Sequence, residues 1–143
     1  MSSCRQRRMV SSRGWQMADI SERVKTKILA KLDADSSVTS LVPARSIFPM
    51  QVASDQTYPF VRYGPPTVVP YEDWCGSGSI VSVTLHCFAT GESAAQKIAA
   101  AIEYSLSRME NVVDYNWVRT QFRQDPDEAG VWDGMVTIEV TDR

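Results

Sequence analysis

The residue types that could support catalysis are few in this chain of 143 residues. His86 is the only histidine, and it lies in the middle of a segment of alternating apolar and polar residues. A serine-type catalytic triad needs a histidine paired with a nucleophile and an orienting carboxylate, and no local pattern supplies these partners. We therefore expect His86 to be a half-exposed histidine of a sheet, and we expect no catalytic residues.

Two groups of acidic residues have side chains that could serve as metal ligands or as acid–base catalysts. Asp125, Asp127 and Glu128 offer the hard oxygen ligands that divalent cations prefer, but they lack the glycine and the spacing of an EF-hand loop. Glu72-Asp73 would need a cleft and raised pKa values for acid–base work, and nothing in the sequence implies either. We expect a solvated loop at residues 125–130, with no metal and no cofactor. A small enzyme with a carboxylate metal site remains the third alternative, and metal-dependent stabilisation that Asp127→Ala removes would support it.

The cysteines and the glycine-rich segment indicate no further chemistry. Cys4, Cys75 and Cys87 form neither a CxxC pair nor a zinc-ligand spacing, and their odd number favours reduced thiols in a protein made in the cytosol. The sequence GSGS at residues 76–79 has no following lysine and precedes a strand rather than a helix, so it is not a phosphate loop. We expect a flexible turn there.

Aromatic residues next to arginines are the remaining candidates for a binding site. Such residues can stack single-stranded bases, and they are also what the centre of a protein–protein interface prefers. Residues 1–16 carry four arginines and no acid, whereas residues 17–143 carry 11 basic and 17 acidic side chains. A body of net charge −6 repels the DNA backbone, so we favour an interface. The candidate interface residues are Tyr71 and Trp74 in a loop, and Tyr115, Trp117, Arg119 and Arg123 on one strand face.

The periodicity of apolar residues predicts the elements that position these side chains. Residues 20–33 and 92–109 have helical spacing, with Asp19 as the N-cap of the first helix. Residues 80–88, 115–123 and 136–140 alternate as strands, and the last two form a hairpin. Shorter elements are expected at residues 38–42 (a helical turn), 47–48 and 60–63 (strands), and at most an edge segment at residues 67–69, because Pro65, Pro66 and Pro70 cannot donate to a sheet ladder.

The predicted fold class is α+β, a mostly antiparallel sheet with two helices packed on one face. We expect one domain over residues 17–143. The preceding residues 1–16 are expected to be a basic and disordered arm, or a segment translated from an upstream start, because Met17-Ala18-Asp19 has the form of a natural beginning.

The order of these apolar segments resembles the tail-terminator, or tail-completion, family of long-tailed bacteriophages and gene-transfer agents. The resemblance covers residues 26–141, and it is carried by ILAKLDAD (28–35), VTSLV (38–42), RSIFP (45–49), YPFVRY (58–63) and VSVTLHCF (81–88). The basic arm departs from the family pattern.

The resemblance implies a structural virion protein and no enzyme. Members look like small subunits that form a ring, commonly a hexamer, at the head-proximal end of the tail tube. The ring ends polymerisation of the tube and joins it to the head connector. In such a ring we expect the excursion at residues 65–79 to reach a neighbouring subunit or the tube and to become ordered on assembly. The implied partners are copies of the chain, the tube protein and the connector. The implied location is the virion tail, and the protein is made in the cytoplasm of the bacterial host. DNA passes through the lumen without specific binding, and we expect Asp125, Asp127 and Glu128 to line it. The alternative is a nucleic-acid-binding module that uses Arg119, Arg123, Trp117 and the basic arm.

Overall fold

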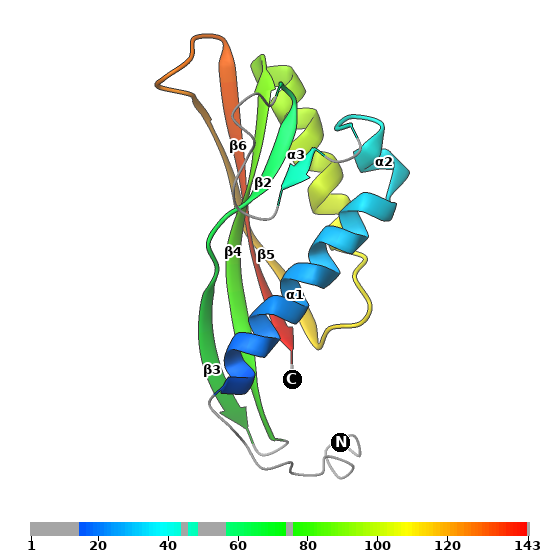
Figure 1. Cartoon of the computed structure of the whole chain (residues 1–143), viewed down its shortest axis with the longest axis vertical. Coiled ribbons are helices and arrows are strands. Elements are labelled where there is room, and N and C mark those ends of the chain that lie inside the picture. Colours follow the sequence, from blue (N-terminus) through cyan, green and yellow to red (C-terminus); the bar gives the residue numbers. More distant parts are fainter. Residues whose placement is uncertain (1–14, 44–45, 49–56, 74–75, 143) are drawn as a thin grey trace.

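The computed structural model describes residues 15–43, 46–48, 57–73 and 76–142, with the side chains of residues 15–19, 48, 71 and 73 left aside. Figure 1 shows an elongated molecule in which a long twisted sheet is covered by helices on one side. The elements are α1 (Trp15–Ala34), α2 (Ser36–Thr39), β1 (Ile47–Phe48), β2 (Phe60–Tyr63), β3 (Thr67–Asp73), β4 (Gly76–Thr90), α3 (Glu92–Leu106), β5 (Asp114–Gln124) and β6 (Val131–Asp142).

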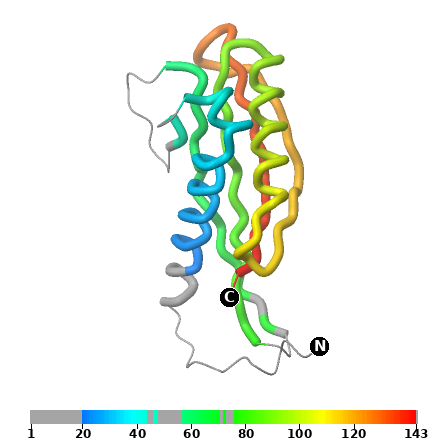
Figure 2. The backbone as a smooth tube through the Cα atoms, turned by 90° about the vertical axis from the view of Figure 1, so that its right-hand side faces the viewer, coloured from blue at the N-terminus to red at the C-terminus, as the bar shows by residue number. Residues whose placement is uncertain are grey.

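Five strands of the six-stranded sheet follow the order β1-β2-β4-β6-β5. The sixth strand, β3, pairs with residues 76–82 of β4, whereas β2 pairs with residues 85–88. Only the short β1–β2 pair is parallel, and the other pairs are antiparallel. Helices α1 and α3 lie side by side on the same face of the sheet (Figure 2). The predicted α+β class and its two-helix layer are confirmed.

The core lies between the helices and the inner face of the sheet. Along β4, Val81, Val83, Leu85 and Cys87 are buried, while the alternate side chains lie on the opposite face and are half-buried. Strand β6 repeats this pattern with the buried residues Val136, Ile138 and Val140. A strand of period two with one apolar face predicts this arrangement, so both strand predictions are confirmed, with β6 extending beyond the predicted residues 136–140.

Helix α1 buries the stripe that its spacing predicts: Ile20, Val24, Ile28 and Leu32 are at most 7% exposed. The predicted start at Asp19 is wrong, because the helix begins at Trp15 and Asp19 lies inside it. An unbroken run of residues compatible with a helix precedes Asp19, so the local capping pattern does not decide the boundary. Helix α3 buries an alanine-rich stripe that includes Ala95 and Ala99. No helix in the described ranges is both long and apolar enough to cross a membrane.

The prediction for residues 65–79 is wrong in two respects. The segment contains a full edge strand, β3, and the GSGS sequence is the beginning of β4 rather than a flexible turn. Gly76 and Gly78 pair with Asp73 and Tyr71, so the cross-strand ladder fixes a sequence that is flexible by composition. Pro70 is tolerated because β3 pairs only with β4 and has its other edge free of any described strand.

Candidate assembly interface

His86 belongs to a small polar cluster on the face of the sheet that carries no helix. Its Nδ1 atom lies 3.2 and 3.1 Å from the two carboxylate oxygens of Asp133 on the neighbouring strand β6. The Asp133 side chain is 2% exposed, and the Nε of Arg123 on β5 lies 3.7 Å from the same carboxylate. The carboxylate therefore links three adjacent strands through charge-assisted contacts.

This cluster has the form of a structural network rather than of a catalytic site. Cys87 follows His86 in the chain, but it points to the opposite face, is fully buried and has a thiol pKa raised by that burial. A thiol in this position is not a nucleophile. Across the part of the chain that the structure describes, no group of three His, Cys, Asp or Glu residues is placed to hold a metal ion.

The acidic hairpin loop is held by a hydrogen bond within the loop and by one from Tyr58. The backbone N–H of Asp127 donates to Oδ1 of Asp125 over 2.9 Å, and the Tyr58 hydroxyl donates to Oε1 of Glu128 over 2.7 Å. The second bond is the main reason that the pKa of Tyr58 is raised to about 12. These carboxylates fix the shape of a loop that projects at one end of the molecule (Figure 1).

An aromatic row lies on the open face of the sheet and was not identified in the sequence. Tyr58 stacks on Phe60, Phe60 on Phe88, and Phe88 on His86, with ring centroids 5.5, 5.0 and 6.0 Å apart. The guanidinium of Arg62 lies 5.9 Å from the centroid of Phe88. The sequence does indicate that these residues face away from the core, because they alternate with the core residues of β2 and β4. That they form one row follows only from the register between β2 and β4.

The predicted aromatic and arginine face of β5 does not exist. A β-bulge between Trp117 and Arg119 shifts the register, so Tyr115 and Trp117 lie opposite core-facing residues of β6, whereas Arg119 and Arg123 lie opposite residues of the open face. A bulge inserts one residue and reverses the alternation beyond it. Tyr115 packs against the core, and burial raises its pKa to about 12, with a contribution from Glu103.

Most of the large apolar side chains that remain exposed gather where β5 and α3 meet. They form a patch, here called the β5–α3 edge, that consists of Tyr104 (60% exposed), Val113 (51%), Trp117 (50%) and Val118 (39%). Trp117 is held in place by donating to Oγ1 of Thr120 over 2.8 Å, and Thr120 donates in turn to Glu103 on α3. Strand β5 is also the last strand of the described sheet, so its outer edge offers backbone groups that pair with no other described strand.

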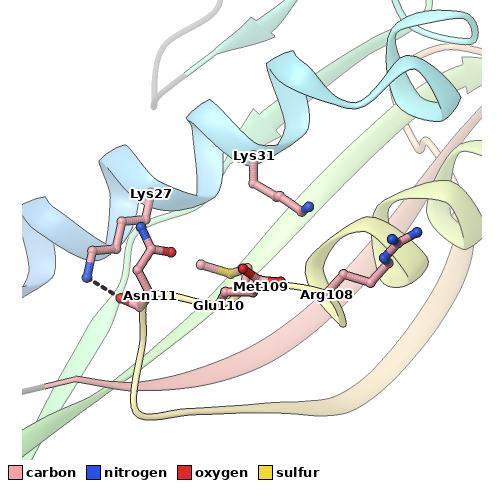
Figure 3. A pocket seen from close by; sticks show the side chains of 6 residues that line it. All are labelled: Lys27, Lys31, Arg108, Met109, Glu110 and Asn111. Atoms are coloured by element: carbon pink, nitrogen blue, oxygen red, sulfur yellow. Dashed lines mark hydrogen bonds between the residues drawn. The ribbon is translucent and has the colours of Figure 1, made fainter.

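Next to Tyr104 of this edge, a hollow of about 250 Å³ lies between α1 and the loop that follows α3. Figure 3 shows its lining: Lys27 and Lys31 come from α1, and Arg108, Met109, Glu110 and Asn111 from the loop. Lys27 donates to the carbonyl of Asn111 over 2.5 Å and forms an ion pair with Asp142 over 2.9 Å. Arg108 lies over the ring of Tyr104, with its Cζ 5.4 Å from the centroid. The hollow joins the β5–α3 edge through this contact.

The two remaining interface candidates are placed only in part. Tyr71 lies on β3, with its side chain outside the described part of the structure, and Trp74 lies outside the described residues altogether. The predicted arm at residues 1–16 also falls outside them, apart from Trp15 and Gln16 at the start of α1.

Comparison with known proteins gives consistent results. The sequence profile of the family described as Tail completion protein gp17 matches residues 26–141. Among solved structures, a chain in the virion of a native gene transfer agent particle has a TM-score of 0.70 at 18% identity, over 82% of this chain and 92% of that chain. The gp17 protein of bacteriophage SPP1 has a TM-score of 0.61 at 17% identity, over 94% of this chain and 97% of that chain. A search of curated proteins by sequence returns no match.

Proposed function

Because this chain belongs to the tail completion protein gp17 family, and is therefore a structural component of a phage-type tail rather than an enzyme, we propose that copies of it assemble into a ring. In this proposal six copies close on the head-proximal end of the tail tube. The ring ends polymerisation of the tube and presents a surface to the head connector. The residues of the β5–α3 edge form one side of each contact between copies.

The observation that carries this proposal is the uneven distribution of the exposed apolar surface. Of the six large apolar side chains that are exposed among the described residues, four lie at the β5–α3 edge, whereas Val69 lies on β3 at the other edge of the sheet and Leu41 lies after α2. A surface that differs between the two sides of a subunit supports head-to-tail contacts, which generate a ring when the rotation closes.

Self-pairing of two β5–α3 edges is the alternative contact, and it would give an isolated dimer. In an antiparallel β5–β5 pair centred on Gln121, each Arg119 would lie opposite the Arg123 of the other copy. Like charges directly opposite one another destabilise a strand pair. This register of a β5–β5 pair is therefore disfavoured.

The hairpin acids are proposed to face the lumen. Asp125, Asp127 and Glu128 lie on a protruding loop that is held by a hydrogen bond within the loop and by one from Tyr58. A wall of carboxylates lets DNA pass without adhering to it, because attraction to phosphates is the main source of non-specific binding. Placement of these side chains on the outer rim of an assembled ring would contradict this part of the proposal.

The nucleic-acid-binding alternative loses its geometric basis. It required Trp117, Arg119 and Arg123 to act together on one face, and the β-bulge places the tryptophan and the arginines on opposite faces. No stacking platform with adjacent cations remains on this strand.

The test is to incubate the full chain with purified tail tubes and to image the tubes by electron microscopy. We expect one ring-shaped density at a single end of each tube, and tubes of fixed length when the protein is present during polymerisation. Density distributed along the tube, or unaltered tube growth, would contradict the proposal.

A further inference from the structure

The hollow between α1 and the α3–β5 loop contains a cation that has no ion-pair partner among the described residues. Lys27 is neutralised by Asp142 at 2.9 Å, and Arg108 is held by its contact with Tyr104 and by a 3.1 Å hydrogen bond from its guanidinium to the Tyr104 hydroxyl. Lys31 is half-buried and reaches over the hollow from α1 (Figure 3). Its charge also acts on Asp35, whose pKa is lowered first by the hydrogen bond from the Ser37 side chain and in smaller part by Lys31. The lining holds three cations, Lys27, Lys31 and Arg108, and one acid, Glu110, so the hollow is a partly enclosed space of net positive charge on a chain whose body is acidic.

An exposed acidic residue lies on the other side of the molecule. Glu72 is on β3, one residue before the last pair of the β3–β4 hairpin, and it forms no ion pair with a described residue. In Figure 1 the β3–β4 hairpin lies at the lower left and the loop after α3 at the lower right, so the two features lie on opposite sides of the same half of the molecule. Head-to-tail neighbours related by rotation bring such opposite sides together.

Val113, two residues after Asn111 of the hollow, is 51% exposed. An apolar contact beside a charge pair excludes water from that pair, and this raises the strength of the pair and fixes the register of the subunits. On the hairpin, Val69 lies three residues before Glu72 and therefore on the opposite face of β3.

We infer that the hollow lined by Lys27, Lys31 and Arg108 is the acceptor site for a carboxylate of the neighbouring copy, and that Glu72 of the β3–β4 hairpin supplies it. This inference rests on the proposed ring and specifies its contact. The occupant is a protein carboxylate rather than a DNA phosphate, because the hollow has room for single side chains and the acidic body around it repels a duplex.

The first experiment uses the unaltered chain. Rings are assembled on tail tubes from a mixture of isotopically light and heavy chains, and they are treated with a carbodiimide, which joins a carboxylate to an amine in contact with it. We expect a Glu72–Lys31 cross-link that contains one light and one heavy peptide, and we expect it to be absent from unassembled protein. Rings visible by microscopy that give no such cross-link would overturn the inference while leaving the ring intact.

The second experiment exchanges the charges. Lys31→Glu and Glu72→Lys should each lower the affinity of the chain for the ring by about tenfold or more, and the chain that carries both changes should recover. Lys97→Glu is the matched control, since Lys97 is an exposed lysine of α3 outside the hollow. An equal loss for the control, or no recovery in the double variant, would overturn the inference. Absence of rings with the unaltered chain would overturn both the inference and the proposed function.

Discussion

Replacement of Trp117 by alanine tests the β5–α3 edge as a subunit contact. The Trp117 side chain is 50% exposed in the single chain. A tryptophan offers roughly 250 Å², so about 125 Å² remains to be buried by a neighbour. At about 25 cal/mol per Å² this burial contributes about 3 kcal/mol to each contact. Since alanine keeps the β-carbon, we expect a loss of about 2–3 kcal/mol, which weakens the contact roughly 30- to 150-fold.

The same substitution also removes an internal interaction, and this must be separated from assembly. The indole N–H donates to Thr120 over 2.8 Å, and loss of such a bond costs about 1 kcal/mol of folding stability. Circular dichroism and urea unfolding therefore accompany the assembly assay, in which the ring-bound fraction is measured by sedimentation with tail tubes. Gln121→Ala is the matched control, because Gln121 is exposed on the same strand and lies opposite a residue of the open face.

A folded Trp117→Ala chain that assembles with unchanged affinity would refute the reasoning. An equal loss of affinity in Gln121→Ala would also refute it. Such a result would show that any substitution on β5 weakens the contact, whether or not it removes apolar area.

Three further predictions concern the folded chain. A Cβ atom at Gly64 would lie 2.7 Å from the backbone oxygen of Thr84, so Gly64→Ala should destabilise the protein by about 2–4 kcal/mol in urea unfolding, and an unchanged midpoint would contradict this close approach. Asp133→Ala leaves His86 and Arg123 without their shared carboxylate and should cost about 2–3 kcal/mol, whereas the same loss in Asp127→Ala would contradict the assignment of that loop to solvent. Burial, with a smaller contribution from Glu22, raises the pKa of Tyr63 from 10.0 to about 12. The fold therefore favours the neutral phenol, and the associated stability is present below pH 10 and lost as the pH rises towards 12. Tyr63→Phe should remove this slope in pH-dependent unfolding, and a slope of unchanged size would show that another group causes it.

The layer arrangement could be predicted because each long element carries a strong local signal. The stripe of Val24, Ile28 and Leu32, and the alternation of Val83 and Leu85, each specify one buried face without reference to any other segment. The limits of α1 and the length of β6 were predicted less accurately than the buried faces. The ends of elements depend on contacts with the rest of the fold.

The binding surfaces were less predictable because they depend on register. A single bulge after Trp117 moves Arg119 and Arg123 to the opposite face of β5. No residue type near Trp117 indicates a bulge at this position. In the same way, the partners of Gly76 and Gly78 lie on β3, so the local composition of the GSGS sequence indicates flexibility where pairing gives a strand. The Asp133 cluster joins three strands, and it can be recognised only once their order is known.

The central claim, that the protein works by closing a ring with copies of itself on the tail tube, is tested most directly by cryo-electron microscopy of the particle that contains it. We expect a single ring of identical copies at the head-proximal end of the tube, with the β5–α3 edge of each copy against the β3 side of the next. Isolated copies at that position, or copies repeated along the length of the tube, would contradict the account.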